Sequence, residues 1–260
     1  MPPASTPAGS GAPSPLSAAA AQRPLSVSVV IPAKNEARNL PGLLPRIPEL
    51  ADEVVLVDGL STDETAAVAR MVHADVVVVH EKRRGKGIAL RSGFEAARGT
   101  FIVMLDADCS MDPAEIPAFL EPLRTGADLV KGSRFLPDGG TTDMTNLRRL
   151  GNYGLVTLMN LLYGSRYTDL CYGFMAFRKD LLDRLALDAD GFEIETQLVA
   201  RATRIGARIA EVPSFESPRL HGTSNLNTFR DGWRVLRSLV SELWWRSREM
   251  VAEPAKQGPA

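Results

Sequence analysis

The sequence predicts an α/β fold in which helices cover both faces of a mostly parallel β-sheet. Short apolar segments alternate with amphipathic segments at the spacing of βαβ units. A length of 260 residues, 45% of them hydrophobic, suits one large α/β domain or two small ones. The net charge of -1 gives no basic field for nucleic acid, and the two cysteines have no metal-site or disulfide pattern. We therefore expect a three-layer αβα sandwich with reduced thiols, as in a cytoplasmic protein.

The elements follow in order after a tail over residues 1–24. This tail consists of Pro, Ala, Ser and Gly with hardly any charge, so it is expected to be disordered. The domain is expected to span residues 25–226. Apolar, β-branched runs predict strands at residues 27–31, 54–57, 76–79, 101–105 and 128–131.

Helices are expected between these strands. The first carries apolar residues at positions 40, 43, 44 and 47, and its prolines leave its start open. The second is expected to begin after segment 61–64, which resembles a capping box, and to run through residue 71. The third spans about residues 87–97. No segment is long and apolar enough for a transmembrane helix.

Polar clusters follow three of the strands, at residues 32–36, 58–63 and 106–108. Parallel strands end at one edge of a sheet, and ligands bind beyond that edge. Residues two apart in an extended segment point the same way, so Asp106 and Asp108 can face one ligand. Carboxylates suit Mg²⁺ or Mn²⁺, which often bridge to phosphates. An isolated Asp-x-Asp more often ends a strand, but three converging clusters favour a metal and phosphate site.

Four segments in this order resemble successive motifs of glycosyltransferase family 2. They are Val-Val-Ile-Pro-Ala-Lys-Asn-Glu (29–36), Val-Asp-Gly-Leu-Ser-Thr-Asp-Glu-Thr (57–65), Gly-Lys-Gly-Ile-Ala-Leu (85–90) and Asp-Ala-Asp (106–108). Within the family, the chain is most similar to the dolichol- or polyprenol-phosphate mannosyltransferase branch, over about residues 27–226. The resemblance implies a GT-A fold and an inverting transfer from a nucleotide-diphosphate sugar, either a GDP- or a UDP-sugar. It also implies that Asp106 and Asp108 bind Mg²⁺ or Mn²⁺.

The resemblance further assigns a donor site. Asp58 matches the acid that reads the nucleobase, although Gly59 and Leu60 depart from the family's usual Asp-Asp-Gly-Ser. Ser110 stands where some relatives place a third metal ligand. The residues implied to bind the donor nucleotide are Pro32, Ala33, Glu36, Asp58, Lys86, Asp106, Ala107 and Asp108.

The basic run at residues 81–87 is either a solvated loop or part of this donor site. Gly85 and Gly87 permit close backbone approach before a helix N-terminus, which is a favourable place for anions. We expect Arg84 and Lys86 to lie beside the donor.

For the acceptor, the resemblance points to arginines that hold a lipid phosphate, because a guanidinium can bind phosphate through two hydrogen bonds. Arg134 matches one such arginine in a Gly-Ser-Arg segment. Residues 136–145 are expected to form a mobile loop over donor and acceptor. The other residues implied to bind the acceptor phosphate are Arg148 or Arg149, Arg219 and Ser224.

Asp169 occupies the position of the catalytic base in members with hydroxyl acceptors. A phosphate monoester is already ionised near neutrality and needs no base, so Asp169 would then orient the acceptor or the arginines. Glu193 and Glu195 either complement a helix dipole or belong to the site. His221 is a further candidate metal ligand.

Residues 227–260 are expected to form an amphipathic helix and tail that hold all three tryptophans. The helix either packs onto the domain or lies in a membrane interface, where Trp and Arg are favoured. The second arrangement would place a cytoplasmic enzyme at the inner face of the membrane, beside a lipid acceptor.

A polyprenyl phosphate is the preferred acceptor. The alternatives are a hydroxyl of a glycan or small molecule with Asp169 as base, a nucleotidyltransferase, and a non-catalytic sugar-nucleotide-binding protein.

Overall fold

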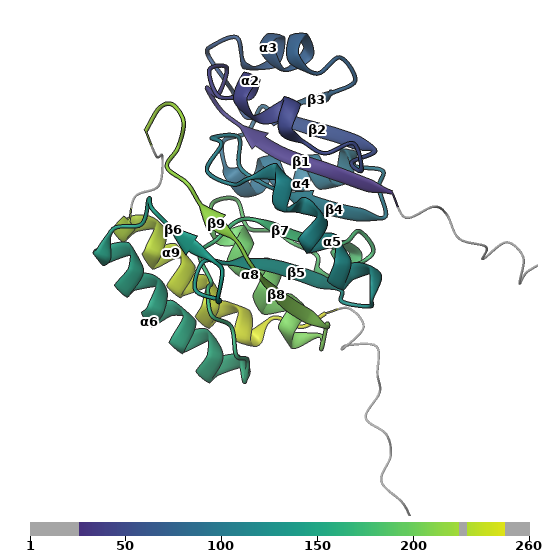
Figure 1. Cartoon of the computed structure of the whole chain (residues 1–260). Helices are drawn as coiled ribbons and strands as arrows, with labels where there is room; N and C mark the ends of the chain where they lie inside the picture. Colours follow the sequence, from purple (N-terminus) through teal and green to yellow (C-terminus); the bar gives the residue numbers. More distant parts are fainter. Residues whose placement is uncertain (1–25, 224–227, 248–260) are drawn as a thin grey trace, which may run out of the picture.

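A seven-stranded sheet forms the centre of the protein, with strand order β3-β2-β1-β4-β7-β5-β8 (Figure 1). The computed structural model describes residues 26–223 and 228–247. All strands run in one direction except β7, which is antiparallel to both its neighbours. The strands are β1 (Val27–Ala33), β2 (Glu53–Asp58), β3 (Val77–His80), β4 (Phe101–Met104), β5 (Leu129–Ser133), β7 (Met175–Arg178) and β8 (Ile209–Pro213). The mostly parallel sheet is therefore confirmed.

Helices bury both faces of this sheet. Val29 and Val103 pack into one core cluster, whereas their neighbours Val30 and Ile102 pack into the other, as the two-residue period of a strand requires. The first face carries α2 (Leu40–Leu43), η1 (Leu44–Arg46), α3 (Thr65–Val72), η2 (Pro113–Glu115) and α5 (Ile116–Arg124). The second carries α4 (Lys86–Ala96), α6 (Asn146–Tyr163), α7 (Leu181–Leu185), α8 (Glu193–Arg204) and α9 (Thr228–Ser241), which continues into η3 (Glu242–Trp244).

The segment at residues 61–64 does not form the expected capping box. The first helical residue of α3 is Thr65, and no side chain caps the helix at Glu64. The Ser61 hydroxyl instead accepts a hydrogen bond from the Asn35 amide (2.9 Å), and the Thr65 hydroxyl accepts one from the Glu36 amide (2.9 Å). Polar side chains after β2 therefore fix the loop that follows β1, which lines the site described below.

One expectation for the later part of the chain needs correction, and for the last helix the structure shows one of the two expected arrangements. Residues 136–145 are not all loop, because they include β6 (Gly140–Thr141), which pairs with β9 (Phe215–Glu216). Helix α9 packs onto the domain, since Val235 and Leu239 are buried and the Tyr163 hydroxyl donates to the Leu239 carbonyl (2.7 Å). The tail at residues 1–24 lies outside the described residues.

None of the helices in the described residues combines the length and the apolarity that crossing a bilayer requires.

Candidate functional site

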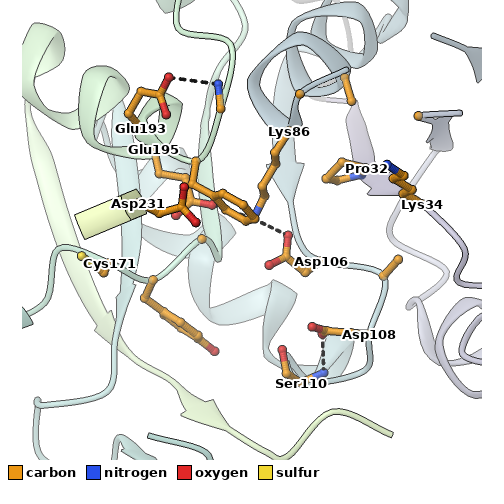
Figure 2. Close-up of a pocket in the computed structure, with 18 of the residues that line it drawn as sticks. Pro32, Lys34, Lys86, Asp106, Asp108, Ser110, Cys171, Glu193, Glu195 and Asp231 are labelled. Carbon is orange, nitrogen blue, oxygen red and sulfur yellow. Dashed lines mark hydrogen bonds and ion pairs between the residues drawn. The ribbon is translucent and has the colours of Figure 1, made fainter. Parts of the chain in front are cut away.

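A cavity of about 780 Å³ opens at the carboxyl ends of the central strands. The end of β1 contributes Pro32 to its lining, and the loops after β2 and β4 contribute Gly59 and Asp106. Residues of α4, α6, α8 and α9 complete its walls. Figure 2 shows Lys86 of α4, Glu195 of α8 and Asp231 of α9 among them. The predicted convergence of strand ends thus takes place, and the cavity joins residues as far apart in the chain as Pro32 and Arg234.

Asp106 and Asp108 both line this cavity, and a different cation contacts each carboxylate. The Lys86 ammonium lies 2.6 Å from Asp106 and 2.7 Å from Glu195 (Figure 2). On the other side, the Arg219 guanidinium lies 2.7 Å from Asp108 and 3.4 Å from Glu36. The carboxylate pair is therefore neutralised from within the chain.

The electrostatics of this group follow from burial and from these pairs. Burial raises the pKa of Asp106, and the charge of Lys86 opposes that rise. Burial also raises the pKa of Glu36, against the hydrogen bond from Asn39 and the charge of Arg219. For Lys86, burial would lower the pKa, but the charges of Asp106 and Glu195 raise it above its ordinary value. Lys86 is therefore protonated throughout the physiological range.

The carboxylate pair suits a hard divalent cation. Asp106 and Asp108 offer oxygen ligands, and the ammonium and guanidinium groups beside them act as stand-ins for a bound cation. The described part of the chain holds no cluster of three or more His, Cys, Asp or Glu side chains arranged for a metal.

Gly85 and Gly87 bring the backbone close to another segment of the chain, whereas the sequence predicted a close approach to an anion. A Cβ atom on Gly87 would lie 2.3 Å from the Ala189 carbonyl oxygen, and one on Gly85 would lie 2.0 Å from that of Asp190. The Gly87 amide donates to the Asp190 carbonyl (3.0 Å), so it is not available to an anion. The close approach is therefore to the backbone at residues 189–190, and it positions Lys86 and Arg84 along the cavity.

Arg134 and Asp169 form a buried cluster behind the cavity and do not line it. The side chains are 1% and 0% exposed, respectively. Arg134 donates to both Asp169 oxygens (2.7 and 2.9 Å) and to Glu216 (3.0 Å). Burial would raise the pKa of Asp169, yet the hydrogen bonds and charge of Arg134 hold it below its ordinary value. The structure therefore differs from the expectation of an accessible base and an accessible phosphate ligand, because each group satisfies the other.

The remaining predicted residues divide between the cavity and its surroundings. Arg148 lines the cavity, whereas Arg149 does not and lies 6.0 Å from the ring centre of Phe135. Asp58 does not line it either. Its carboxylate lies 3.3 Å from the His80 ring. The predicted residues that line the cavity are Pro32, Ala33, Glu36, Arg84, Lys86, Asp106, Ala107, Asp108, Ser110, Arg148, Glu193, Glu195 and Arg219. Ser224 lies outside the described residues.

Sequence reasoning missed the contribution of two other segments to the cavity. Arg230 and Arg234 of α9 line it, as does Glu216 at the end of β9. Glu216 connects the cavity to the buried cluster, because it accepts hydrogen bonds from Arg134 (3.0 Å) and Thr141 (2.7 Å). No local sequence pattern predicts that these residues line the cavity, because the packing of α9 and the pairing of β6 with β9 bring them there.

Comparison with known proteins shows that this chain is similar to glycosyltransferases. A model of the family described as glycosyl transferase family 2 matches residues 28–186. Glycosyltransferase AglJ of Haloferax volcanii is 33% identical over 222 residues, which cover 83% of this chain and 71% of that protein. An undecaprenyl-phosphate mannosyltransferase of Micrococcus luteus is 34% identical over 215 residues, covering 78% of this chain and 88% of that protein. The chain spans only 53% of a longer relative, the hexosyltransferase Agl6 of Haloferax volcanii.

A solved structure extends the likeness to three dimensions. Glucosyl-3-phosphoglycerate synthase from Mycobacterium tuberculosis, in complex with Mn²⁺, UDP and glucosyl-3-phosphoglycerate, has a TM-score of 0.67 and 27% identity. The match covers 84% of this chain and 80% of that chain. The same synthase has also been solved with Mg²⁺ and UDP.

Proposed function

Because the chain belongs to glycosyltransferase family 2 and has the GT-A fold, we propose that it moves a hexose from a nucleotide-diphosphate sugar to a polyprenyl phosphate with inversion. The observation that carries the proposal is the composition of the cavity. The carboxylates Asp106 and Asp108 lie at the end of β4, and the arginines Arg148 and Arg219 line the same space. One space therefore offers ligands for a metal-bound diphosphate and for a second anion.

On the donor side, the nucleotide is proposed to lie along the carboxyl ends of β1 and β2, where Pro32, Ala33 and Gly59 line the cavity. Asp58 remains a proposed contact of the nucleobase, because it directly precedes Gly59. A Mg²⁺ or Mn²⁺ held by Asp106 and Asp108 would supply positive charge that stabilises the departing nucleoside diphosphate. Lys86 and Arg84 add fixed positive charge on the same side.

On the acceptor side, Arg148 and Arg219 are proposed to bind and orient the phosphate. A phosphate monoester with its second pKa near 6 is largely dianionic at neutral pH, so one of its oxygens can attack the anomeric carbon without a base. This agrees with the burial of Asp169 behind Arg134. We assign Arg134 and Asp169 a positioning role, since Arg134 holds Glu216 at the cavity wall.

A lipid acceptor requires the cavity to face a membrane, and one surface of the protein suits this. Helices α6 and α9 lie side by side (Figure 1), both contribute residues to the cavity, and both expose large apolar side chains. These are Leu147, Leu150, Tyr153 and Leu161 on α6, and Phe229 and Trp233 on α9. Helix α6 contains no acidic residue, and the one acid of α9, Asp231, is buried. The exposed charges of both helices are therefore basic, which favours an anionic bilayer.

Liposome flotation tests this surface. The protein should float with vesicles that contain an anionic phospholipid, and Trp233→Glu should lower the bound fraction. Met71→Glu is the matched control, because Met71 is 77% exposed on α3, on the other face of the sheet. Equal binding by the two variants would remove α9 from the membrane contact.

The function itself is tested by transfer. Labelled GDP-mannose, UDP-glucose and other nucleotide sugars are incubated with undecaprenyl phosphate and Mn²⁺, and label is measured in the organic phase. Label that enters the organic phase as an acid-labile phosphodiester supports the proposal. Label that appears only on a hydroxyl of a water-soluble glycan or phosphorylated small molecule would support the alternative acceptor class instead. Donor binding without turnover on any acceptor would indicate a sugar-nucleotide-binding protein.

A further inference from the structure

The two cations at the carboxylate pair are unequal, and this difference suggests how the site changes when it is filled. Lys86 contacts Asp106 and Glu195 at similar distances, 2.6 and 2.7 Å. Arg219 contacts Asp108 at 2.7 Å, but its second carboxylate, Glu36, lies at 3.4 Å. If the pair takes a cation, Lys86 keeps a close partner, whereas Arg219 keeps only the longer contact.

The surroundings of Arg219 allow its side chain to move while the backbone stays fixed. The amide of Ser217 donates to the Ser110 carbonyl (2.9 Å), and the amide of Leu220 donates to the Asp108 carbonyl (3.0 Å). These bonds hold the chain on both sides of Arg219 against the loop that carries Asp108. The Arg219 side chain is 21% exposed and lines the cavity, so its guanidinium can rotate into the space where a second anion would lie.

We propose that Lys86 and Arg219 are internal counter-ions of the carboxylate pair, and that Arg219 leaves Asp108 for the acceptor's phosphate when the pair takes a divalent cation. A buried or half-buried carboxylate without a counter-ion is costly, so the metal-free protein needs these two side chains. Two added positive charges beside Arg219 repel it, which makes its transfer to an anion favourable. Metal and acceptor then bind cooperatively. The transfer of Arg219 to the acceptor's phosphate rests on the proposed function, whereas its pairing with Asp108 does not.

The competition between Arg219 and a divalent cation at the carboxylate pair is tested with Mn²⁺ alone, without donor or acceptor. Calorimetry and the electron paramagnetic resonance signal of free Mn²⁺ measure the binding. Arg219→Gln should tighten Mn²⁺ binding by about fivefold or more, the usual lower limit of coupling between linked sites. Arg148→Gln is the matched control, because it also removes a cavity arginine but one that pairs with Asp143 (3.6 Å). It should change Mn²⁺ affinity by less than about twofold, since the charge it removes is more distant and screened. Equal effects of the two variants, or weaker binding by Arg219→Gln, would overturn the proposal.

A measurement on the unaltered protein guards against misfolding of the variant. An arginine-selective dicarbonyl reagent modifies free guanidinium groups faster than paired ones, and peptide mass mapping locates the product. Mn²⁺ alone should accelerate modification of Arg219 relative to Arg148. A rate that does not change, or that falls, would contradict displacement of Arg219.

The coupling is tested with a short-chain prenyl phosphate as the acceptor probe. Mn²⁺ should raise its affinity for the wild-type protein more than its affinity for Arg219→Gln, in which only the direct attraction between metal and phosphate remains. An equal rise in both proteins would show that Arg219 does not carry the coupling. None of these readouts needs sugar transfer, so a failed transfer assay would refute the proposed function while leaving the counter-ion result intact.

Discussion

Replacement of Arg134 by Met distinguishes a structural ion pair from a phosphate ligand. The side chain of Asp169 is 0% exposed, and its two oxygens accept hydrogen bonds from Arg134 at 2.7 and 2.9 Å. Without Arg134, Asp169 is a buried carboxylate that has lost its two closest side-chain donors, and Glu216 loses a donor as well. The variant should therefore unfold more easily rather than only bind the acceptor less tightly.

The magnitude follows from the burial of both partners. Removing one member of a buried, hydrogen-bonded ion pair costs about 3–5 kcal/mol of the free energy of unfolding. For a domain of this size, that cost lowers the melting temperature by roughly 10 °C. Urea unfolding followed by far-ultraviolet circular dichroism at pH 7 measures it, with the urea midpoint falling and the slope unchanged. Arg148→Met is the control and should cost less than about 1 kcal/mol, because its pair with Asp143 is partly exposed.

A double variant tests whether the lost stability belongs to the pair. In Arg134→Met with Asp169→Asn, the uncompensated charge is absent, so the loss should be smaller than the sum of the two single losses by about 1–3 kcal/mol. The reasoning is refuted if Arg134→Met unfolds at the wild-type urea concentration while acceptor binding disappears. Arg134 would then be a ligand that reaches the cavity in solution.

Three further changes have defined outcomes. Asp106→Asn or Asp108→Asn should lower Mn²⁺-dependent transfer at least about 100-fold, as loss of electrostatic stabilisation does, with a melting curve close to that of the wild type. Gly87→Ala should cost about 1–3 kcal/mol in urea unfolding because its Cβ meets the Ala189 carbonyl, whereas Gly154→Ala in α6 meets nothing within 4 Å and should stabilise. Folding lowers the pKa of Asp169, so its stabilising contribution is complete above its unfolded pKa and is lost as the pH falls below about 4. The urea midpoint should therefore fall less steeply with decreasing pH in Asp169→Asn than in the wild type.

Most of the parallel sheet was predictable from local pattern, because its strands are short, β-branched runs buried on both faces. The five predicted strands begin and end within two residues of β1 to β5. The strand β7 was not predicted. It inserts antiparallel between β4 and β5, an arrangement that no pattern within Met175–Arg178 indicates. Strand β8, at the edge beside β5, was not predicted either.

The cavity residues on strand ends were predictable for the same reason, since a parallel sheet brings its carboxyl ends together. The partners of charged residues were not predictable. Arg134 and Arg219 are both arginines in family-like segments, and sequence alone gave them the same role. Their exposure in the folded protein, which depends on the β6–β9 pair and on the loop after β4, separates them.

This difference in exposure decides which ion pair a ligand can open. The Arg134–Asp169 pair is 1% and 0% exposed, so a ligand that separated it would leave two charges in a low-dielectric interior. The Arg219–Asp108 pair is 21% and 10% exposed and faces the cavity, so water or a metal can replace the guanidinium at little cost in solvation. The same arginine–aspartate chemistry therefore stabilises the fold at one position and remains exchangeable at the other. If Arg219→Gln proved as destabilising to urea unfolding as Arg134→Met, exposure would not be the property that separates these two pairs.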